Sequence, residues 1–327
     1  MKFLIKTIPG MEEIEMEEIV ELVKAKNFKK IIDGYVIFEA ENYKNLRKAL
    51  GIIKAMKLID YFEFKNKDEI FERLSKIEFR IKEPFVVRCT RYGEHEFNSR
   101  DIESGIGEII FNKGYSVNLT NPKTIISVEI VNDFFFIGIL IADHLNKRKY
   151  RLRRNNKAID SVLANLLVRY SRLKEKELIV DPFCKDGVIP IEAAIYAKKA
   201  KIWGLDDNIN NVRNAKINAE LAKVNIKILK YDVSWLGYLF KENSVDKIVT
   251  NPPIPTKKLK ENKLQPIYEE FFFQAKNILK KEGILLIVTQ KPEFVKRFSR
   301  NLFLLEEKKV FFKKMEYSIL VFKKQKA

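Results

Sequence analysis

The stretch LIVDPFCKDGVIPIEAA, which runs from Leu178 to Ala194, decides the fold of this chain. Its apolar start predicts a short strand, Leu178–Val180, and its apolar end predicts a helix, Pro190–Ala200. Asp181 opens the polar turn between them. A strand, a turn and a helix in this order form the repeating unit of parallel α/β sheets, which bind ligands at the carboxyl ends of their strands. The stretch therefore predicts a ligand site in this turn.

The same alternation continues along the second half of the chain and predicts a doubly wound, Rossmann-like α/β sheet. The expected helices are Ser161–Leu173, Pro190–Ala200, Asn210–Ala222, Ile267–Lys280 and Phe294–Asn301. The expected strands are Leu178–Val180, Lys201–Leu205, Ile226–Leu229, Asp246–Thr250, Gly283–Thr289, Leu304–Phe312 and Met315–Phe322. The last two strands are too closely joined for a parallel crossover, so we expect them to form a C-terminal antiparallel hairpin.

The first half of the chain is predicted to hold two smaller α+β modules. One is a ferredoxin-like module with the order β-α-β-α-β over residues 1–66. Its expected elements are strand Lys2–Thr7, helix Met11–Lys26, strand Tyr35–Glu39, helix Tyr43–Leu50 and strand Ala55–Phe64. The other module spans 67–146, and its expected elements are strand Pro84–Thr90, helix Ser99–Asn112 capped near Ser99 and Glu103, and strands Gly114–Leu119, Thr124–Val131 and Phe134–Ala142. A basic linker over 147–160 leads into the Rossmann-like domain over 161–327.

The charge of the chain points to a nucleic-acid partner. Lys and Arg total 62 against 44 for Asp and Glu, which gives a formal net charge of +18 over 327 residues. Such a surplus favours nucleic acid first and an anionic membrane surface second. Its most concentrated part is a run in the linker: Lys147, Arg148, Lys149, Arg151, Arg153 and Arg154. A solvated face is the ordinary alternative for any such run.

Other features of the composition exclude several classes of protein. The longest apolar run, Phe134–Ala142, is far shorter than the roughly 20 residues of a membrane span. A signal-peptide pattern is absent, because glutamates from Glu12 onward interrupt the N-terminal residues. Two cysteines provide no disulfide framework, and two histidines beside them do not complete a conventional zinc site. We therefore expect a cytoplasmic protein that binds no metal.

Three aspartates at successive strand ends favour a nucleoside site. Asp181, Asp206 and Asp232 follow the first, second and third strands of the predicted sheet. Asp206 comes nineteen residues after Gly187, a spacing typical of a carboxylate that accepts from ribose hydroxyls. Asp232 is placed to accept from an adenine amine, and Gly187 permits close backbone approach to a ligand. Each acid alone is more often a loop or cap residue, and the three together carry the prediction.

A second motif, Thr250-Asn251-Pro252-Pro253, follows the fourth strand. Two consecutive prolines fix the backbone, so the Asn251 side chain and the neighbouring carbonyls are rigid acceptors. Such a group can hold the two hydrogens of an exocyclic NH2 and aim its lone pair at an electrophilic methyl group. No strong base is needed, because the nitrogen becomes acidic once it is alkylated. An Asn-Pro turn without chemistry is the alternative.

Together these motifs resemble the class I, S-adenosylmethionine-dependent RNA methyltransferases that carry an N-terminal THUMP domain. The first half supports the resemblance, which spans nearly the whole chain. Three of its segments, Thr90–Phe97, Gly114–Pro122 and 146–151, are similar to THUMP segments. Asn-Pro-Pro rather than Asp-Pro-Pro resembles the branch that makes N2-methylguanosine near position 6 of tRNA, in the acceptor stem.

The resemblance implies a role for each candidate residue. Those expected to hold the acceptor amine are Asn251, Pro252 and Pro253. Those expected to hold S-adenosylmethionine are Asp181, Phe183, Lys185, Gly187, Asp206, Asp207, Asp232 and Asn251. Those expected to contact tRNA are Arg91, Asn98, Arg100, Lys147, Arg148, Lys149, Arg151, Arg153, Arg154 and Ile254. A monomer is favoured, and the need for a partner subunit stays open.

The chain departs from the family pattern at both motifs. Lys185 and Asp186 precede Gly187 where the family has glycine and a small residue. The lysine could fill the cofactor pocket, or its ammonium could meet the cofactor carboxylate. Ile254 and Pro255 stand where the family has an aromatic residue and a glycine; base–aromatic stacking is worth about 1–3 kcal/mol.

Aromatic residues elsewhere could replace the missing platform, namely Tyr268 or the phenylalanines at 271–273, although core packing is their commoner role. Two other functions therefore stay open. One is a tRNA-binding protein or subunit whose methyltransferase domain is inactive, and the other is a DNA adenine-N6 methyltransferase.

Overall fold

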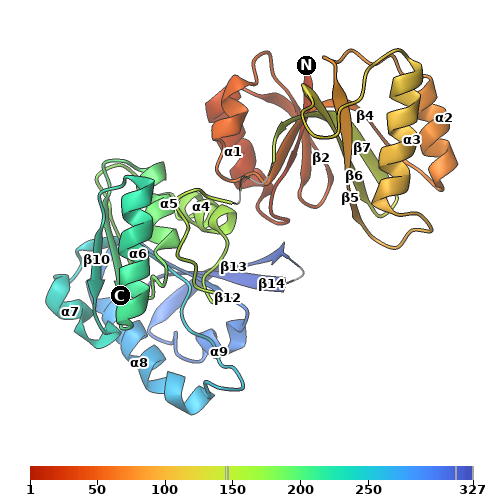
Figure 1. Cartoon of the computed structure of the whole chain (residues 1–327). Helices are drawn as coiled ribbons and strands as arrows, with labels where there is room; N and C mark the ends of the chain where they lie inside the picture. The colour runs from red at the N-terminus through yellow and green to blue at the C-terminus, as the bar shows by residue number, and fades with distance from the viewer. Residues whose placement is uncertain (144, 146, 314, 326–327) are drawn as a thin grey trace. The chain divides into compact units, whose positions relative to one another are not determined.

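The computed structural model describes residues 1–143, 145, 147–313 and 315–325. They form two compact units (Figure 1). The first holds strands β1 to β7 with helices α2 and α3. The second holds the chain from Leu145 onward, together with the segments Thr7–Glu17 and Leu50–Ile52. Among the residues described, no helix is long and apolar enough to cross a membrane.

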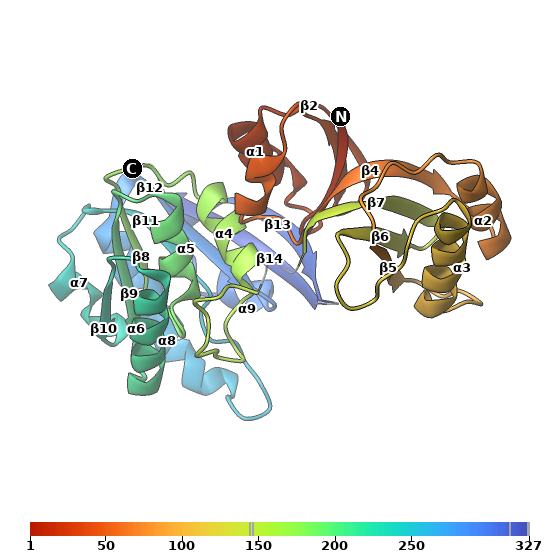
Figure 2. The same ribbon diagram turned by 45° about the horizontal axis from the view of Figure 1, so that its top comes forward.

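The first unit is built on one seven-stranded sheet with the order β2-β3-β1-β4-β7-β6-β5. Its strands are β1 (Lys2–Lys6), β2 (Lys26–Ile32), β3 (Tyr35–Glu39), β4 (Lys54–Glu63), β5 (Phe85–Tyr92), β6 (Thr124–Val131) and β7 (Phe134–Ala142). All neighbouring pairs are antiparallel except β5 and β6. Helices α2 (Lys67–Ser75) and α3 (Ser99–Asn112) pack together beside the end of the sheet that holds β5 to β7 (Figure 2). Ile102, Ile106 and Ile110 of α3 contribute to one apolar core with side chains of α2 and β6.

This sheet is continuous across the two N-terminal modules expected from the sequence. β4 belongs to residues 1–66 and pairs along its length with β7, which belongs to residues 67–146. The domain limits drawn from the sequence stay predictions, and the pairing shows that the two segments share a sheet.

Several N-terminal elements differ from expectation. The helix expected over Met11–Lys26 is α1 (Glu12–Val23), and β2 follows it as an edge strand that the lysine-rich sequence did not suggest. The helix expected over Tyr43–Leu50 is a short 3₁₀ turn, η1 (Lys44–Lys48). Residues 114–119 form no strand and contribute a single bridge, between Val117 and Phe85. Helix α2 was not predicted.

The second unit is a seven-stranded sheet with the order β10-β9-β8-β11-β12-β14-β13. Its strands are β8 (Leu178–Asp181), β9 (Lys201–Asp206), β10 (Lys227–Lys230), β11 (Val245–Thr250), β12 (Leu279–Thr289), β13 (Leu302–Phe312) and β14 (Met315–Lys324). The pairs β10–β9, β9–β8, β8–β11 and β11–β12 are parallel. The pairs β12–β14 and β14–β13 are antiparallel. The predicted doubly wound sheet with a C-terminal hairpin is confirmed. Strand order reverses between β8 and β11, which is the switch point where such sheets bind ligands.

Helices cover this sheet and close two apolar cores. They are α4 (Ser161–Tyr170), α5 (Val188–Tyr196), α6 (Ile209–Ala222), η2 (Val233–Trp235), α7 (Leu236–Leu239), α8 (Glu261–Ile278) and α9 (Pro292–Lys296). Tyr268, Phe271 and Phe272 of α8 are buried in the larger core. The second core joins Ile191 of α5 to Ala215 of α6. Helix α8 begins six residues earlier than predicted, because Pro266 lies within its second turn instead of marking its start.

Candidate active site

The two predicted motifs meet at the switch point. Asp181 ends β8 and Thr250 ends β11, and the Thr250 hydroxyl donates to Asp181 Oδ1 over 2.6 Å. The backbone N–H of Phe183 donates to the same oxygen. Asp181 is 2% exposed, and burial raises its pKa despite these two hydrogen bonds. Asp181 therefore ties the two turns together, which is an internal role rather than an open cofactor contact.

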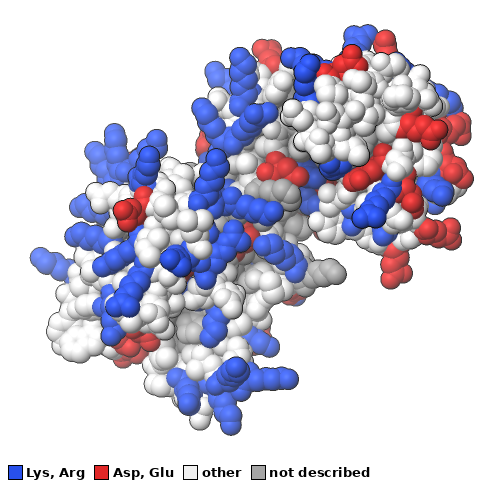
Figure 3. Space-filling model, viewed as in Figure 1, with Lys and Arg blue, Asp and Glu red and all other residues white. Residues whose placement is uncertain are grey.

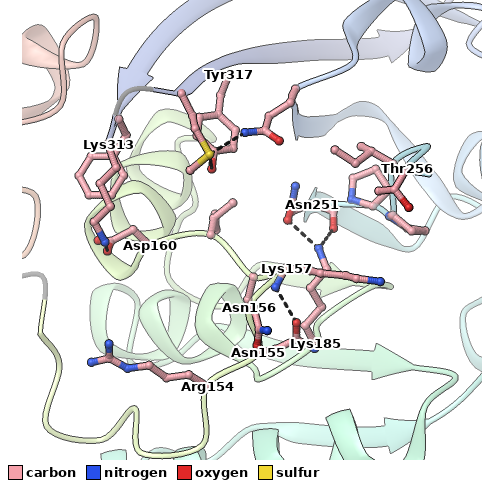
Figure 4. A pocket seen from close by; sticks show the side chains of 18 of the residues that line it. Arg154, Asn155, Asn156, Lys157, Asp160, Lys185, Asn251, Thr256, Lys313 and Tyr317 are labelled. Carbon is pink, nitrogen blue, oxygen red and sulfur yellow. Dashed lines mark hydrogen bonds and ion pairs between the residues drawn. The ribbon is translucent and has the colours of Figure 1, made fainter. Parts of the chain in front are cut away.

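Lys185 lies across the crevice between the two turns (Figure 4). Its Nζ donates to the backbone oxygen and to Oδ1 of Asn251, the latter over 2.6 Å. The Nδ2 of Asn251 donates to the Val288 carbonyl over 2.8 Å, which fixes the orientation of the amide. Burial lowers the pKa of Lys185, while the nearby carboxylates oppose this shift. The amide of Asn251 is thus held with its oxygen toward an amine.

Gly187 has a packing role at the start of α5. Its φ is +81°, and a Cβ built there would lie 3.0 Å from the Cβ of Ala215. Glycine is required because the conformation is left-handed and α6 is close. The close approach predicted for a ligand is made here by another helix.

Asp186 beside it is fully buried and accepts from Arg151 Nε over 2.9 Å and from the Asn155 N–H over 3.1 Å. It anchors the linker to the turn after β8.

The carboxylates at the ends of β9 and β10 divide into one buried and two exposed groups. Asp206 accepts from Lys185 N, Asn208 N and Asn211 Nδ2, so both of its oxygens are hydrogen-bonded. Asp207 and Asp232 are exposed. With Lys230, Tyr231 and Trp235 they line a cavity of about 410 Å³. Burial raises the pKa of Asp207, and the charges of Asp206 and Asp232 add to this shift.

A second cavity, of about 510 Å³, opens around Asn251 (Figure 4). Pro252, Pro253 and Ile254 form part of its wall. Other lining residues come from the linker and from the β13–β14 hairpin, including Arg154, Lys157, Phe312, Lys313, Met315 and Tyr317. The sequence analysis did not include the hairpin residues among the candidate site residues. The available signal was that the hairpin forms the last two strands of the same sheet.

The aromatic substitutes expected from α8 do not line this cavity. Tyr268 is fully buried and its hydroxyl donates to the Pro253 carbonyl over 2.8 Å. Phe271 and Phe272 are also buried, and Phe183 packs edge-on against Phe271. Tyr268 thus supports the Asn-Pro-Pro turn from within the core, whereas Tyr317 of the hairpin lines the cavity.

The basic linker is partly internal. Arg148 Nε pairs with Glu192 Oε1 over 2.8 Å, and Glu192 also accepts from Tyr150 and Asn165. The predicted phosphate contacts of Arg148 and Arg151 are therefore corrected, because both side chains are 8% exposed and both guanidinium groups are paired with buried carboxylates. The exposed cations of the run are Lys147, Lys149, Arg153 and Arg154. In the view of Figure 3, Lys and Arg side chains cover much of the second unit.

The three RNA-binding candidates of the first unit lie in different surroundings. Arg91 hydrogen-bonds to His95 Nδ1 over 2.7 Å and to the Gly93 carbonyl. Asn98 caps α3, in place of the expected Ser99, through a capping box with Asp101. Arg100 is exposed. Contact with RNA stays a prediction for all three.

Comparison with known proteins identifies both halves of the chain. A family model described as an RMKL-like methyltransferase domain matches residues 148–319, and a THUMP domain model matches residues 64–140. The chain belongs to the RMKL-like methyltransferase family. This confirms the resemblance to THUMP-containing class I methyltransferases.

The curated relatives include two tRNA-modifying enzymes of Methanocaldococcus jannaschii. A tRNA (guanine(6)-N2)-methyltransferase is 29% identical over 70% of this chain and 73% of its own. A tRNA (guanine(10)-N2)-dimethyltransferase is 28% identical over 79% of this chain and 84% of its own. A solved structure titled SMU.472, a putative methyltransferase complexed with SAH, shares the fold with a TM-score of 0.80, 17% identity and coverage of 100% and 98%.

The cofactor of this RMKL-like methyltransferase is S-adenosylmethionine, and the site fits its nucleoside end. Asp207 and Asp232 can accept from ribose hydroxyls and an adenine amine, and Trp235 beside them is half exposed. Lys185 links the ends of β9 and β11, since its backbone N–H donates to Asp206 and its Nζ donates to Asn251.

Proposed function

We propose that this protein transfers a methyl group from S-adenosylmethionine to the exocyclic N2 of a guanosine in tRNA, near position 6 of the acceptor stem. One observation carries the proposal. The Oδ1 and the backbone oxygen of Asn251 both accept hydrogen bonds from one nitrogen, Lys185 Nζ, at the switch point of the sheet. The two tRNA relatives, which modify guanine N2, support the same nitrogen as the acceptor.

The chain's own residues account for acceptor binding. The guanine amine donates its two hydrogens to Asn251, whose amide is oriented by Val288. Tyr268 and the two prolines keep the turn rigid. S-adenosylmethionine, when bound, supplies an electrophilic methyl group. The nitrogen loses a proton after alkylation, so no strong base is needed beside it.

The larger cavity provides space for a base that has left its stack. Ile254 forms one wall and Tyr317 belongs to the hairpin that forms another. Removing a base from the helix costs a few kcal/mol, which contacts in this cavity offset. We expect Arg154 and Lys157, which line the same cavity, to contact the flanking phosphates.

The RNA is held by the first half and by the exposed cations of the linker. In this proposal residues 1–66 and 67–146 dock the 3′ end of tRNA, the role that the resemblance to THUMP domains implies. Lys147, Lys149, Arg153 and Arg154 contact phosphates, which position the RNA without reading sequence. The protein acts in the cytoplasm, where its tRNA substrate is found.

Transfer of labelled methyl groups to unmodified tRNA tests the proposal. We expect N2-methylguanosine in the digested tRNA, and Asn251→Ala should abolish it while tRNA binding stays within about twofold. Asn301→Ala, at an exposed asparagine that does not line the cavity, is the matched control. Folded protein that makes no N2-methylguanosine would refute the proposal.

The choice of substrate is tested separately. Duplex DNA offered in competition should remain unmethylated, since an adenine-N6 enzyme would make N6-methyladenine instead. The methylated position is assigned with two tRNA transcripts, one with the guanosine at position 6 replaced and one with the guanosine at position 10 replaced. Loss of product from the position 10 transcript alone would contradict the assignment to position 6.

A further inference from the structure

The Lys185 ammonium occupies the place that an acceptor amine would take. Its Nζ donates to Oδ1 and to the backbone oxygen of Asn251. These are the two acceptors that the Asn-Pro-Pro motif would offer to the two hydrogens of an exocyclic NH2. One nitrogen at a time can use both, because each oxygen is directed into the same crevice. The side chain is therefore an internal counterpart of the substrate group.

The surroundings hold this lysine in place. The residue is 8% exposed and faces the cavity around Asn251. The carboxylates of Asp181, Asp186 and Asp206 favour its charged form, while burial disfavours it. Its backbone N–H donates to Asp206 over 2.9 Å, so the residue is anchored at the end of β9 while its side chain reaches the end of β11. The side chain thus spans the switch point.

The backbone at this position would accept a residue without a side chain. Lys185 has a φ of +51°, a left-handed conformation that glycine adopts without cost. A glycine here would leave the turn unchanged and would free both oxygens of Asn251 from the Lys185 ammonium. The side chain, and not the turn, therefore occupies the two oxygens.

We propose that Lys185 occupies the acceptor-amine site in the free protein and must be displaced before the methyl donor and the guanosine can enter. This inference rests on the proposed function. Free protein is closed at the switch point. Entry of the donor then exchanges the contacts between Lys185 and Asn251 for contacts with the ligand, and the amine of the substrate takes over the two oxygens.

Calorimetry with S-adenosylhomocysteine tests the displacement on the full-length protein. Lys185→Gly should bind it at least tenfold more tightly than the natural chain, because no side chain has to leave. Lys185→Arg, which keeps the charge and the length, should bind no more tightly than the natural chain. Affinities of Lys185→Gly and the natural chain within twofold of each other, or no binding by either, would overturn the proposal. Thermal unfolding of each variant confirms that it is folded.

A spectroscopic readout separates this proposal from the proposed function. A buried, hydrogen-bonded lysine ammonium exchanges its protons slowly and gives an Nζ resonance, which Lys185→Gly identifies by its loss. Adding S-adenosylhomocysteine should broaden or remove this resonance in the natural chain, and an unchanged resonance at saturation would overturn the displacement. If the ligand displaces Lys185 but no guanosine is methylated, the proposed function fails and the occupancy of the acceptor site stands.

Discussion

Tyr317→Ala should weaken productive binding of the target guanosine while leaving the fold intact. Tyr317 lines the cavity around Asn251 and is partly exposed, so its ring is available to a flipped base. The position after Asn-Pro-Pro holds Ile254. In α8, Tyr268, Phe271 and Phe272 are buried, and Phe273 is exposed but does not line the cavity. Tyr317 is therefore the aromatic residue expected to stack on the base.

The size of the effect follows from the stacking free energy. Base–aromatic stacking contributes about 1–3 kcal/mol, which corresponds to roughly 5- to 160-fold in a binding constant. We expect kcat/KM for tRNA methylation to fall within this range. Tyr317→Phe should retain most of the activity, because the hydroxyl's contact is with the Met315 sulfur at 3.9 Å.

The assay is steady-state methylation of a tRNA transcript at several RNA concentrations. Phe311→Ala is the matched control, since Phe311 is an exposed aromatic residue of the same hairpin that does not line the cavity. Equal loss for Phe311→Ala and Tyr317→Ala would refute the reasoning, and so would Tyr317→Ala with unchanged kcat/KM.

Two further changes test the linker. Arg148→Met should destabilise the fold by about 3–5 kcal/mol, because it leaves Glu192 as a buried and unpaired carboxylate; urea unfolding measures this, with exposed Lys149→Met as the control, and similar stabilities would contradict the internal role of Arg148. Replacing Lys147, Lys149, Arg153 and Arg154 by Gln should weaken tRNA binding and lower the slope of log K against log salt by roughly 3 to 4, since each phosphate contact contributes about 0.7–0.9. An unchanged slope in filter binding would return these cations to ordinary solvated surface.

Several elements of the first unit were predicted to the residue. Helix α3 and strands β6 and β7 have the bounds expected from their apolar repeats. Strand β2 was missed because it is an edge strand rich in lysine, and its burial pattern has no alternating apolar face. The local sequence pattern therefore predicts an element correctly where one face of it is buried. It does not predict a strand that is held only by pairing with a distant part of the chain.

The site was located from the sequence, but the partners of its charged groups were not. Asp181 and Asn251 lie together at the switch point, as the strand ends required. Arg148 was assigned to phosphate because its partner, Glu192, is distant in sequence and a buried ion pair leaves no local pattern. Tyr317 was missed because the pairing of β14 with β12, which is distant in sequence from Asn251, brings it to the site.

The pairing of β4 with β7 has a consequence for synthesis on the ribosome. β4 is ten residues long, and its partner along one edge is made only when residues 134–142 have been added. At about 5–20 residues per second, that edge emerges roughly 4 to 15 seconds before its partner. An unpaired edge strand is a template for association with other chains. Nascent chains stalled before β7 should therefore depend on chaperones more than those stalled just after it.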